Sequence, residues 1–526
     1  MTPTFCNRCG DALEEGCDPR DELAELDALL ERLRLKRYHL NKKINRFHSP
    51  ILRQLPPDVM SCIFEFCLPE FTDRQLSLDY YSNINETDRR DLSIPLSLGA
   101  ICSYWREIAW STPSLWSSLV VRVTCKLDTN IATDIAQEWL TRSGQLPLSI
   151  HILSEGFYTK PVSALAHIIN QYSSRWSDLD IPDQYYQYFH ATDNLAPILK
   201  TIRLHRPLDA IGYPSYKFQL TCPRLERASF SCLPKDGPNI QWDNLTHLTV
   251  HNMSIIDSLL VLHKTPRLVF YKISDFRIHY GHHMTAPVPV LTPLRSLQLM
   301  MKASFIENFL NNIITPHLEE LGLPYYYNPT IEVITSFLRR SACSLRSLSM
   351  NFSNIPPHYE NFMRLLQSIP SLNTLSITSI TTATRYTRVE SSTPEYYDPR
   401  NILQLVAKVL SSQSTSHEQR FLPNLKILEY TGELYLRPGN YNDLYSLPPV
   451  DNVANGPLHL INFDLFQTSP IPKNMISYIS SLEERGITVN VFCGPVDILQ
   501  PSIDYYRDKE ASLSRDWADN LDSSLF

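Results

Sequence analysis

The chain has 526 residues, of which 43% are hydrophobic and 20% are charged, and its formal net charge is −7. This length exceeds one compact core, and the negative charge argues against a nucleic-acid-binding surface over the whole chain. Fourteen glycines against 38 prolines disfavour glycine-rich phosphate loops. The sequence shows no signal-peptide core and no run of about twenty apolar residues, and its eleven cysteines are scattered. We therefore expect a soluble protein of the cytoplasm or nucleus that binds no membrane and no nucleic acid.

The first twenty residues contain three cysteines that leave two interpretations open. Cys6 and Cys9 are separated by two residues, and Cys17 follows them. A closed structural zinc site needs four ligands, and no further cysteine or histidine occurs before His39. The cysteines fit either half of a zinc site shared between two chains or a flexible leader, residues 1–20, with reduced thiols. We expect the leader, and we predict no metal and no cofactor.

Residues 21–48 show the clearest helical pattern of the sequence. Seven of eight residues along one seam are apolar, and they alternate in spacing between three and four, which is typical of a coiled coil. The seam consists of Leu23, Leu26, Leu30, Leu33, Arg37, Leu40, Ile44 and Phe47. Acidic residues precede basic ones along this segment, as the helix dipole favours. We expect a coiled-coil helix that either forms a homodimer or folds back on the segment that follows.

Residues 50–121 begin with PILRQLPPDVMSCIFEFCLPEF and end with LSLGAICSYWREIAWSTPSLWSSLVV. Two prolines followed by Asp58 suit the first turn of a helix. The expected apolar face of this helix is Val59, Ile63, Phe64 and Cys67. A second helix is expected from Leu96 to Trp110, with Thr112-Pro113 as its stop and Leu115-Trp116 as a final apolar anchor.

The ordered set of these motifs resembles an F-box. Its halves are separated by a polar insertion, residues 69–91, which resembles the long insertion in F-box proteins of mushroom-forming (basidiomycete) fungi. The resemblance implies binding to a Skp-family adaptor and, through it, to a cullin. The adaptor-binding residues that it implies are Leu55, Pro56, Asp58, Val59, Ile63, Phe64, Leu98, Cys102, Trp105 and Trp116.

From residue 199 onward the pattern L-x-x-L-x-L recurs, often directly after a proline. Its first leucines are residues 199, 225, 245, 268, 294, 318, 345 and 372, and the pattern returns at 425 and 458. Spacings of 20 to 27 residues match leucine-rich repeats, in which each repeat supplies one strand and a helix or loop. The first two leucines of each repeat are expected to point into a shared core, because no single repeat can bury its own apolar face.

The expected fold class is α/β, with a coiled-coil helix and a small helical F-box followed by an irregular leucine-rich-repeat solenoid, or horseshoe. The solenoid is assigned to residues 122–500, and residues 501–526 to a capping helix or frayed tail. The helices expected between strands are Ile131–Ser143, Val162–Trp176, Ile255–His263, Phe305–Ile314, Ile331–Arg340, Tyr359–Ile369, Ile402–Ser411 and Met475–Glu484. Thr378–Arg400 and Tyr435–Val453 are expected to be loops.

The sequence contains none of the common catalytic motifs, and the histidine pair in Gly281–His283 has no acidic or cysteine ligand nearby. Tyrosine pairs such as Tyr185-Tyr186, Tyr325–Tyr327 and Tyr396-Tyr397 fit either contact anchors for a partner or ordinary packing. We therefore predict that the chain is not an enzyme.

The most economical hypothesis is the substrate-recognition subunit of a cullin-based (SCF-type) ubiquitin ligase, whose F-box binds the adaptor and whose repeats bind an unknown target protein. Two alternatives stay open. One is a non-ligase scaffold that uses the same interaction modules, and the other is a catalytic protein with a site among loops such as Thr378–Arg400.

Overall fold

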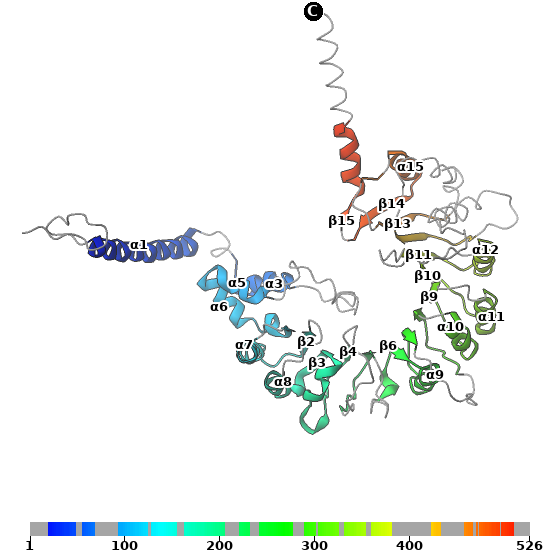
Figure 1. The fold of residues 1–526 in the computed structure, drawn as a ribbon, viewed down its shortest axis with the longest axis horizontal. Helices are drawn as coiled ribbons and strands as arrows, with labels where there is room; N and C mark the ends of the chain where they lie inside the picture. Colours follow the sequence, from blue (N-terminus) through cyan, green and yellow to red (C-terminus); the bar gives the residue numbers. More distant parts are fainter. Residues whose placement is uncertain are drawn as a thin grey trace, which may run out of the picture. The chain divides into compact units, whose positions relative to one another are not determined.

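The computed structural model divides into two compact units, Met1–Thr192 and Asp193–Phe526, which are described separately (Figure 1). The described residues are 19–48, 55–68, 93–124, 128–154, 162–205, 220–231, 241–276, 289–300, 303–325, 331–353, 359–380, 422–432, 457–465, 470–471, 473–494 and 496–509. Several expectations lie outside them: the cysteine-containing leader, the insertion 69–91, the pair His282-His283, Tyr396-Tyr397, the helix Ile402–Ser411 and the loop Tyr435–Val453.

The first unit begins with a long helix, α1 (Pro19–His48), which confirms the helix expected at 21–48. Three short helices follow: α3 (Pro57–Phe66), α5 (Ile94–Ile101) and α6 (Ser103–Ser111). The expectation of one helix from Leu96 to Trp110 was wrong, because Cys102 between α5 and α6 is extended, with φ −158° and ψ 168°. A 3-10 turn, η2 (Pro113–Trp116), then carries the expected apolar anchor.

The rest of the first unit alternates strands with helices. Three parallel strands, β1 (Ser118–Val123), β2 (Leu148–Ser154) and β3 (Trp176–Pro182), pair in chain order. Between them lie α7 (Thr129–Arg142), α8 (Ser163–Asn170) and η3 (Ser173–Arg175), and η4 (Asp183–Tyr188) follows β3. β1 was not expected as a strand, and it crosses the boundary assigned between the F-box and the solenoid at residues 121 and 122. The helix expected at Val162–Trp176 was too long, because α8 ends at Asn170.

The caps of α7 show why this helix has its observed length. The Asp128 side chain accepts hydrogen bonds from the amides of Asn130 and Ile131, at 2.9 and 3.3 Å, which satisfies donors at the helix start. After Arg142 the chain leaves the helix through Gly144, whose φ of +59° suits a residue without a side chain. The end of the helix expected at Ile131–Ser143 is therefore confirmed to within one residue.

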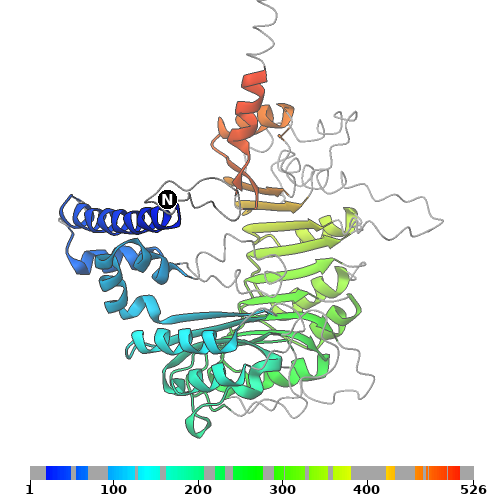
Figure 2. The same cartoon turned by 60° about the vertical axis from the view of Figure 1, so that its left-hand side comes forward.

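The second unit contains a sheet whose strands follow chain order. From β4 to β14 the neighbours pair in parallel, and only β15 (Val496–Asp497) is antiparallel. The strands are β4 (Thr201–His205), β5 (Arg227–Phe230), β6 (His247–Met253), β7 (Phe270–Phe276), β8 (Ser296–Met300), β9 (Glu320–Tyr325), β10 (Ser347–Ser353), β11 (Thr374–Ile380), β12 (Ile427–Gly432), β13 (Leu460–Leu465) and β14 (Thr488–Cys493). Figure 2 shows them stacked as successive rungs.

Each repeated strand begins two residues after the first leucine of its motif. The ten first leucines are at most 4% exposed, so they anchor a turn that precedes each strand. The residue after such a leucine offers its carbonyl to two amides of the next repeat. Lys200 accepts from Glu226 and Arg227, both at 2.9 Å, and the same arrangement recurs in the described chain at the carbonyls of Glu226, Thr246, Val269, Arg295, Glu319, Arg346, Asn373 and Lys426. The buried first leucine and this pair of backbone hydrogen bonds therefore recur together from repeat to repeat.

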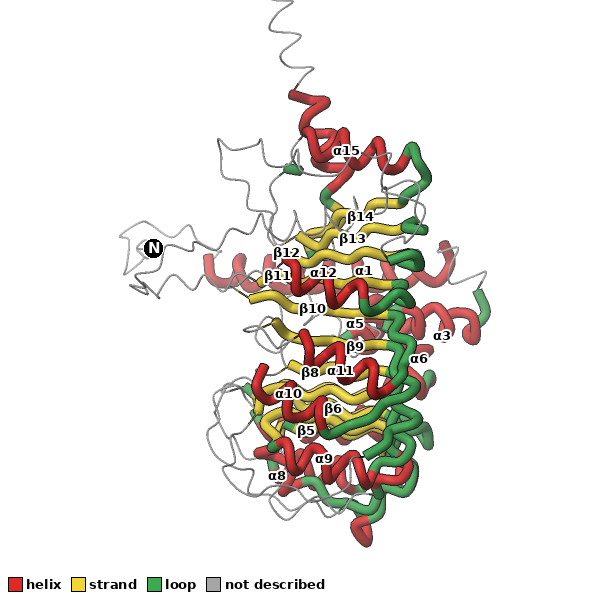
Figure 3. Tube along the Cα trace, turned by 90° about the vertical axis from the view of Figure 1, so that its right-hand side faces the viewer, coloured by secondary structure: helices red, strands yellow, loops and turns green. Residues whose placement is uncertain are grey.

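Helices cover one face of this sheet (Figure 3). They are α9 (Ile255–Lys264), α10 (Ala303–Asn311), α11 (Ile331–Ser341), α12 (Tyr359–Gln367) and α15 (Lys473–Glu483), and their ends lie within about three residues of the expected ones. Adjacent helices from α9 to α12 pack against one another. Residues 499–509 form a further helix, in which the Ser502 hydroxyl accepts a hydrogen bond from the Ile471 amide at 3.0 Å, so this part of the expected cap is helical and docked.

Helix α9 offers a matched test of the core. Leu262 is 2% exposed and Leu260 is 45% exposed on the same helix. Leu262→Ala should lower the free energy of unfolding by about 2–5 kcal/mol, because it removes buried methyl groups and leaves a cavity. Leu260→Ala should change it by less than about 0.5 kcal/mol. Urea unfolding of both variants measures the difference, and equal effects would contradict this assignment of the core.

Candidate functional site

The motif Leu-Pro-Pro-Asp-Val forms the entrance to α3. Pro56 caps the helix in an extended conformation, Pro57 occupies its first position, and Asp58 places a carboxylate in the first turn. The Met60 amide donates to the Pro56 carbonyl at 3.1 Å. Proline loses no hydrogen bond at such a position, and the carboxylate complements the positive helix end. Both prolines and Asp58 are exposed, so this entrance is open to a partner.

The side chains of α3 divide into a buried face and an exposed face. Met60 and Phe64 are at most 1% exposed, whereas Val59 and Ile63 are 43% and 41% exposed. The expectation of one apolar face that included Val59, Ile63 and Cys67 was therefore wrong. Residues four apart share a helix face, so the pairs 60/64 and 59/63 lie on neighbouring faces, and only the former packs inward.

The buried face of α3 packs on α6. The rings of Phe64 and Trp105 lie 5.0 Å apart between centroids, with planes inclined by 51°. Two polar contacts flank this pair: the hydroxyls of Ser61 and Thr112 are 2.8 Å apart, and Ser114 donates to the Glu65 carboxylate. Trp105 is half-buried, whereas Phe64 is fully buried.

Cys102 acts as a helix cap in this structure. Its thiol sulfur accepts a hydrogen bond from the Trp105 amide at 3.4 Å, at the first turn of α6. Leu98 of α5 is only 8% exposed. Gly99 on α5 lies against Trp110, so closely that a Cβ there would overlap the indole ring. These contacts explain why α5 and α6 pack tightly although the chain breaks between them.

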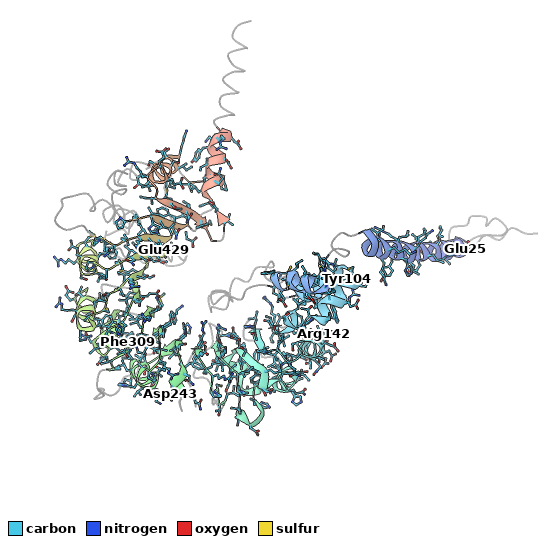
Figure 4. The ribbon with its side chains drawn as sticks, turned by 180° about the vertical axis from the view of Figure 1, so that it is seen from behind. Glu25, Tyr104, Arg142, Asp243, Phe309 and Glu429 are labelled. Carbon is cyan, nitrogen blue, oxygen red and sulfur yellow. The ribbon has the colours of Figure 1, made fainter. Side chains whose placement is uncertain are left out.

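Trp116 lies at the centre of an aromatic cluster. It is fully buried, and its indole nitrogen donates to the Ala109 carbonyl at 2.7 Å. Its ring meets Trp110 and Trp139 edge-on, at centroid distances of 5.4 and 4.8 Å. The Arg142 guanidinium lies 5.0 Å from the Trp116 ring and is labelled in Figure 4. Trp116 therefore joins α6 to α7 and is not available to a partner.

The structure thus separates the ten residues expected to bind an adaptor into three groups. Pro56, Asp58, Val59 and Ile63 are exposed, Leu55, Cys102 and Trp105 are half-buried, and Phe64, Leu98 and Trp116 are buried. The resemblance to a family could not distinguish contact residues from core residues.

Phe66 is a contact candidate that the sequence analysis missed. It is 91% exposed and follows Val59 and Ile63 at spacings of seven and three, on one helix face. We name Val59, Ile63 and Phe66 the α3 stripe. The i, i+4, i+7 spacing was the available signal. Helix α5 exposes two more apolar side chains, Leu96 at 41% and Ile101 at 57%.

A second candidate surface lies on the face of the second unit's sheet opposite its helices. The strand register aligns one residue from each of eleven strands, of which ten are half-buried and one, Gly322, is buried. We name this set the polar row: Arg203, Ser229, Thr249, Lys272, Gln298, Gly322, Ser349, Ser376, Glu429, Asn462 and Asn490. The row contains no large apolar side chain, and Gln298 lies directly over Gly322.

Two of the described groups with catalytic chemistry, the His151–Asp180 pair and the Cys222 thiol, are buried. His151 Nδ1 and Asp180 Oδ2 lie 3.7 Å apart on paired strands, but their side chains are only 4% and 1% exposed. Burial raises the pKa of the Cys222 thiol to about 12, so it stays protonated at neutral pH and is a poor nucleophile. The described part of the chain holds no group of three or more histidine, cysteine and acidic residues that could bind a metal.

The tyrosine pair Tyr185-Tyr186 is 1% and 3% exposed, which supports packing rather than partner contact at this position. In the part of the chain that the structure describes, no helix combines the length and the apolar composition needed to cross a bilayer.

Comparison with known proteins adds no relative: no protein-family model matches this chain, and no curated protein matches it.

The two phenylalanines of α3 test the division between its faces. Phe64 is fully buried and Phe66 is 91% exposed. Phe64→Ala should lower the free energy of unfolding of the first unit by about 3–5 kcal/mol, since it opens a cavity beneath Trp105. Phe66→Ala should leave stability within about 0.5 kcal/mol. Thermal and urea unfolding provide the readout, and a destabilising Phe66→Ala would show that the stripe is structural.

Proposed function

We propose that this chain is the substrate-recognition subunit of a cullin-based ubiquitin ligase, with the α3 entrance and the α3 stripe as its contact with a Skp-family adaptor. The observation that carries the proposal is the exposure of Val59, Ile63 and Phe66 beside the exposed Pro56, Pro57 and Asp58. Apolar side chains aligned on one rigid helix face suit a partner's groove, in which a few such anchors supply most of the binding energy. The contact between Phe64 and Trp105 packs this helix against α6.

We propose further that the second unit is an irregular leucine-rich-repeat solenoid. Three features support this: strands in parallel register, a buried first leucine in every repeat, and a carbonyl that accepts two amides from the next repeat. In such an array neighbouring repeats share one core, and the face opposite the helices displays one residue per strand. The polar row is then the surface offered to a target protein, which hydrogen bonds and charges would recognise.

The chain would contribute proximity rather than chemistry, because it holds a target near the ubiquitin-transferring partner. A non-ligase scaffold with the same two contacts is the second candidate. Affinity purification with and without proteasome inhibition distinguishes the two: a ligase subunit co-purifies cullin and accumulates its target when the proteasome is inhibited. Adaptor without cullin, and no accumulating protein, would favour the scaffold.

Ile63 and Cys62 provide a matched pair for the adaptor contact, since both are exposed on α3 and only Ile63 belongs to the stripe. Ile63→Asp should weaken binding of purified adaptor on the order of thirtyfold, the equivalent of about 2 kcal/mol, because it introduces a charge into an apolar contact. Cys62→Asp should bind as the unmodified protein does. Calorimetric titration measures both, with circular dichroism as the control for folding. Unchanged binding by Ile63→Asp would refute the proposed contact.

Lys272 and Lys264 provide a matched pair for the target surface. Lys272 lies in the polar row on β7, whereas Lys264 is exposed at the end of α9 on the helical face. Lys272→Glu should abolish or strongly reduce target recovery in affinity purification while adaptor binding is kept, because it reverses a charge of the recognition face. Lys264→Glu should recover adaptor and target alike. Loss of target only with Lys264→Glu would place recognition on the helical face instead.

A further inference from the structure

Helix α1 presents an apolar seam that its own chain leaves exposed. All of its described side chains, from residue 23 to residue 44, are exposed. The described apolar seam residues, Leu23, Leu26, Leu30, Leu33, Leu40 and Ile44, are each 50–60% exposed. Figure 4 shows side chains around the whole circumference of this helix, with Glu25 labelled near its beginning. An isolated helix gains little stability in water from propensity alone, so a partner for this seam would stabilise it substantially.

The spacing of the seam residues is the same when it is read from either end, so the seam can pair layer by layer with an antiparallel copy of itself. About a centre at residue 35, an antiparallel second copy places Leu23 opposite Phe47, Leu26 opposite Ile44, and Leu30 opposite Leu40. The remaining layer joins Leu33 to Arg37. Every layer therefore contains at least one leucine or isoleucine, and three of the four kinds of layer are apolar on both sides, as knobs-into-holes packing requires.

We propose that two copies of this chain pair through α1 as an antiparallel coiled coil. The partner that covers the seam is thus a second copy of α1. Arg37, the polar residue of the seam, determines whether the two helices run parallel or antiparallel. The inference concerns assembly and does not depend on the proposed adaptor or target contacts.

Arg37 separates the two orientations. In a parallel pair in register, Arg37 of one copy would face Arg37 of the other inside the seam, and two like charges would share an apolar layer. In the antiparallel pair each Arg37 lies opposite Leu33. Its aliphatic stem can then cover the leucine while the guanidinium reaches solvent.

The distribution of charge along α1 favours the same orientation. Residues 21–34 contain five carboxylates against two arginines, and residues 35–47 contain five basic side chains and no acidic one. Antiparallel pairing places each acidic half beside a basic half, whereas parallel pairing aligns like with like. Since these side chains are exposed, this contribution is modest and decreases with salt.

One contribution opposes the antiparallel arrangement. It brings Lys36 of the two copies near each other at the flank of the central layers, and likewise Arg34. Arg34 already has a partner on its own helix, with its Nη1 atom 3.5 Å from the Glu31 carboxylate. Both flanking positions are solvated, so their repulsion costs less than an arginine pair inside the seam. The balance therefore favours the antiparallel pair.

Leu33 and Leu35 test whether the seam carries assembly. They are 53% and 52% exposed, yet only Leu33 is a seam position. Leu33→Asp should convert the full-length protein from dimer to monomer, with at least a tenfold rise in the dissociation constant measured by analytical ultracentrifugation. Leu35→Asp should remain dimeric. An unmodified protein that is monomeric at tens of micromolar, or an equal response of both variants, would overturn the proposal. Adaptor binding by Leu33→Asp should be unchanged, which separates this test from the proposed function.

Disulfide trapping tests the direction of the pair. In a background with serine at residues 6, 9, 17, 62 and 67, Leu26→Cys chains are mixed with Ile44→Cys chains under mild oxidation. The antiparallel pair should yield the mixed disulfide between residues 26 and 44, and Leu26→Cys alone should yield little. A dominant disulfide between two Leu26→Cys chains would establish the parallel orientation and refute the antiparallel one. The background without introduced cysteine is the control.

Discussion

The arrangement of the second unit depends on one recurring hydrogen-bond arrangement, in which a single carbonyl accepts two amides from the next repeat. The acceptor always follows the first leucine of the motif, and that leucine is buried at every repeat. Burial of the leucine therefore positions the carbonyl, and the carbonyl sets the register of the following strand. Because the core and the backbone ladder constrain the same residues, the polar row stays aligned over eleven strands.

In the first unit, aromatic packing fixes the positions of the helices that carry the exposed residues. Phe64 is held under Trp105, and Trp116 is held between Trp110 and Trp139. These contacts immobilise α3 and α6, so that Val59, Ile63 and Phe66 are displayed from a rigid support. A binding site gains from such support because less conformational freedom is lost when the partner docks. Buried and exposed apolar residues alternate within a single ten-residue helix.

The sequence predicts much of the fold because the leucine motif carries both the core and the repeat period. Strand order and the helices α9 to α12 follow from it, and the end of α7 before Gly144 follows from local turn chemistry. The break at Cys102 was not predictable, since apolar periodicity continues through it and only the sulfur cap on α6 marks the division. At the candidate site, periodicity identified α3 but grouped the buried Phe64 with the exposed Val59, Ile63 and Cys67 on one face, without a choice between buried and exposed positions. That choice depends on where α6 lies, which the local sequence does not encode. Phe66 was missed for the same reason, whereas Tyr185 and Tyr186 illustrate that exposure cannot be inferred from residue type.

The register of the sheet is independent of the length of chain between its strands. β11 ends at Ile380 and β12 begins at Ile427, yet Thr374 still pairs with Ile427 just as Ser347 pairs with Thr374 one repeat earlier. The same holds for β13, which begins at Leu460 after β12 ends at Gly432. Longer connections add only a slowly growing closure entropy, so strand pairing tolerates them. Connections at these two positions can therefore gain or lose residues over evolution, and accept inserted peptide tags in the laboratory, without a shift in the pairing of the strands on either side.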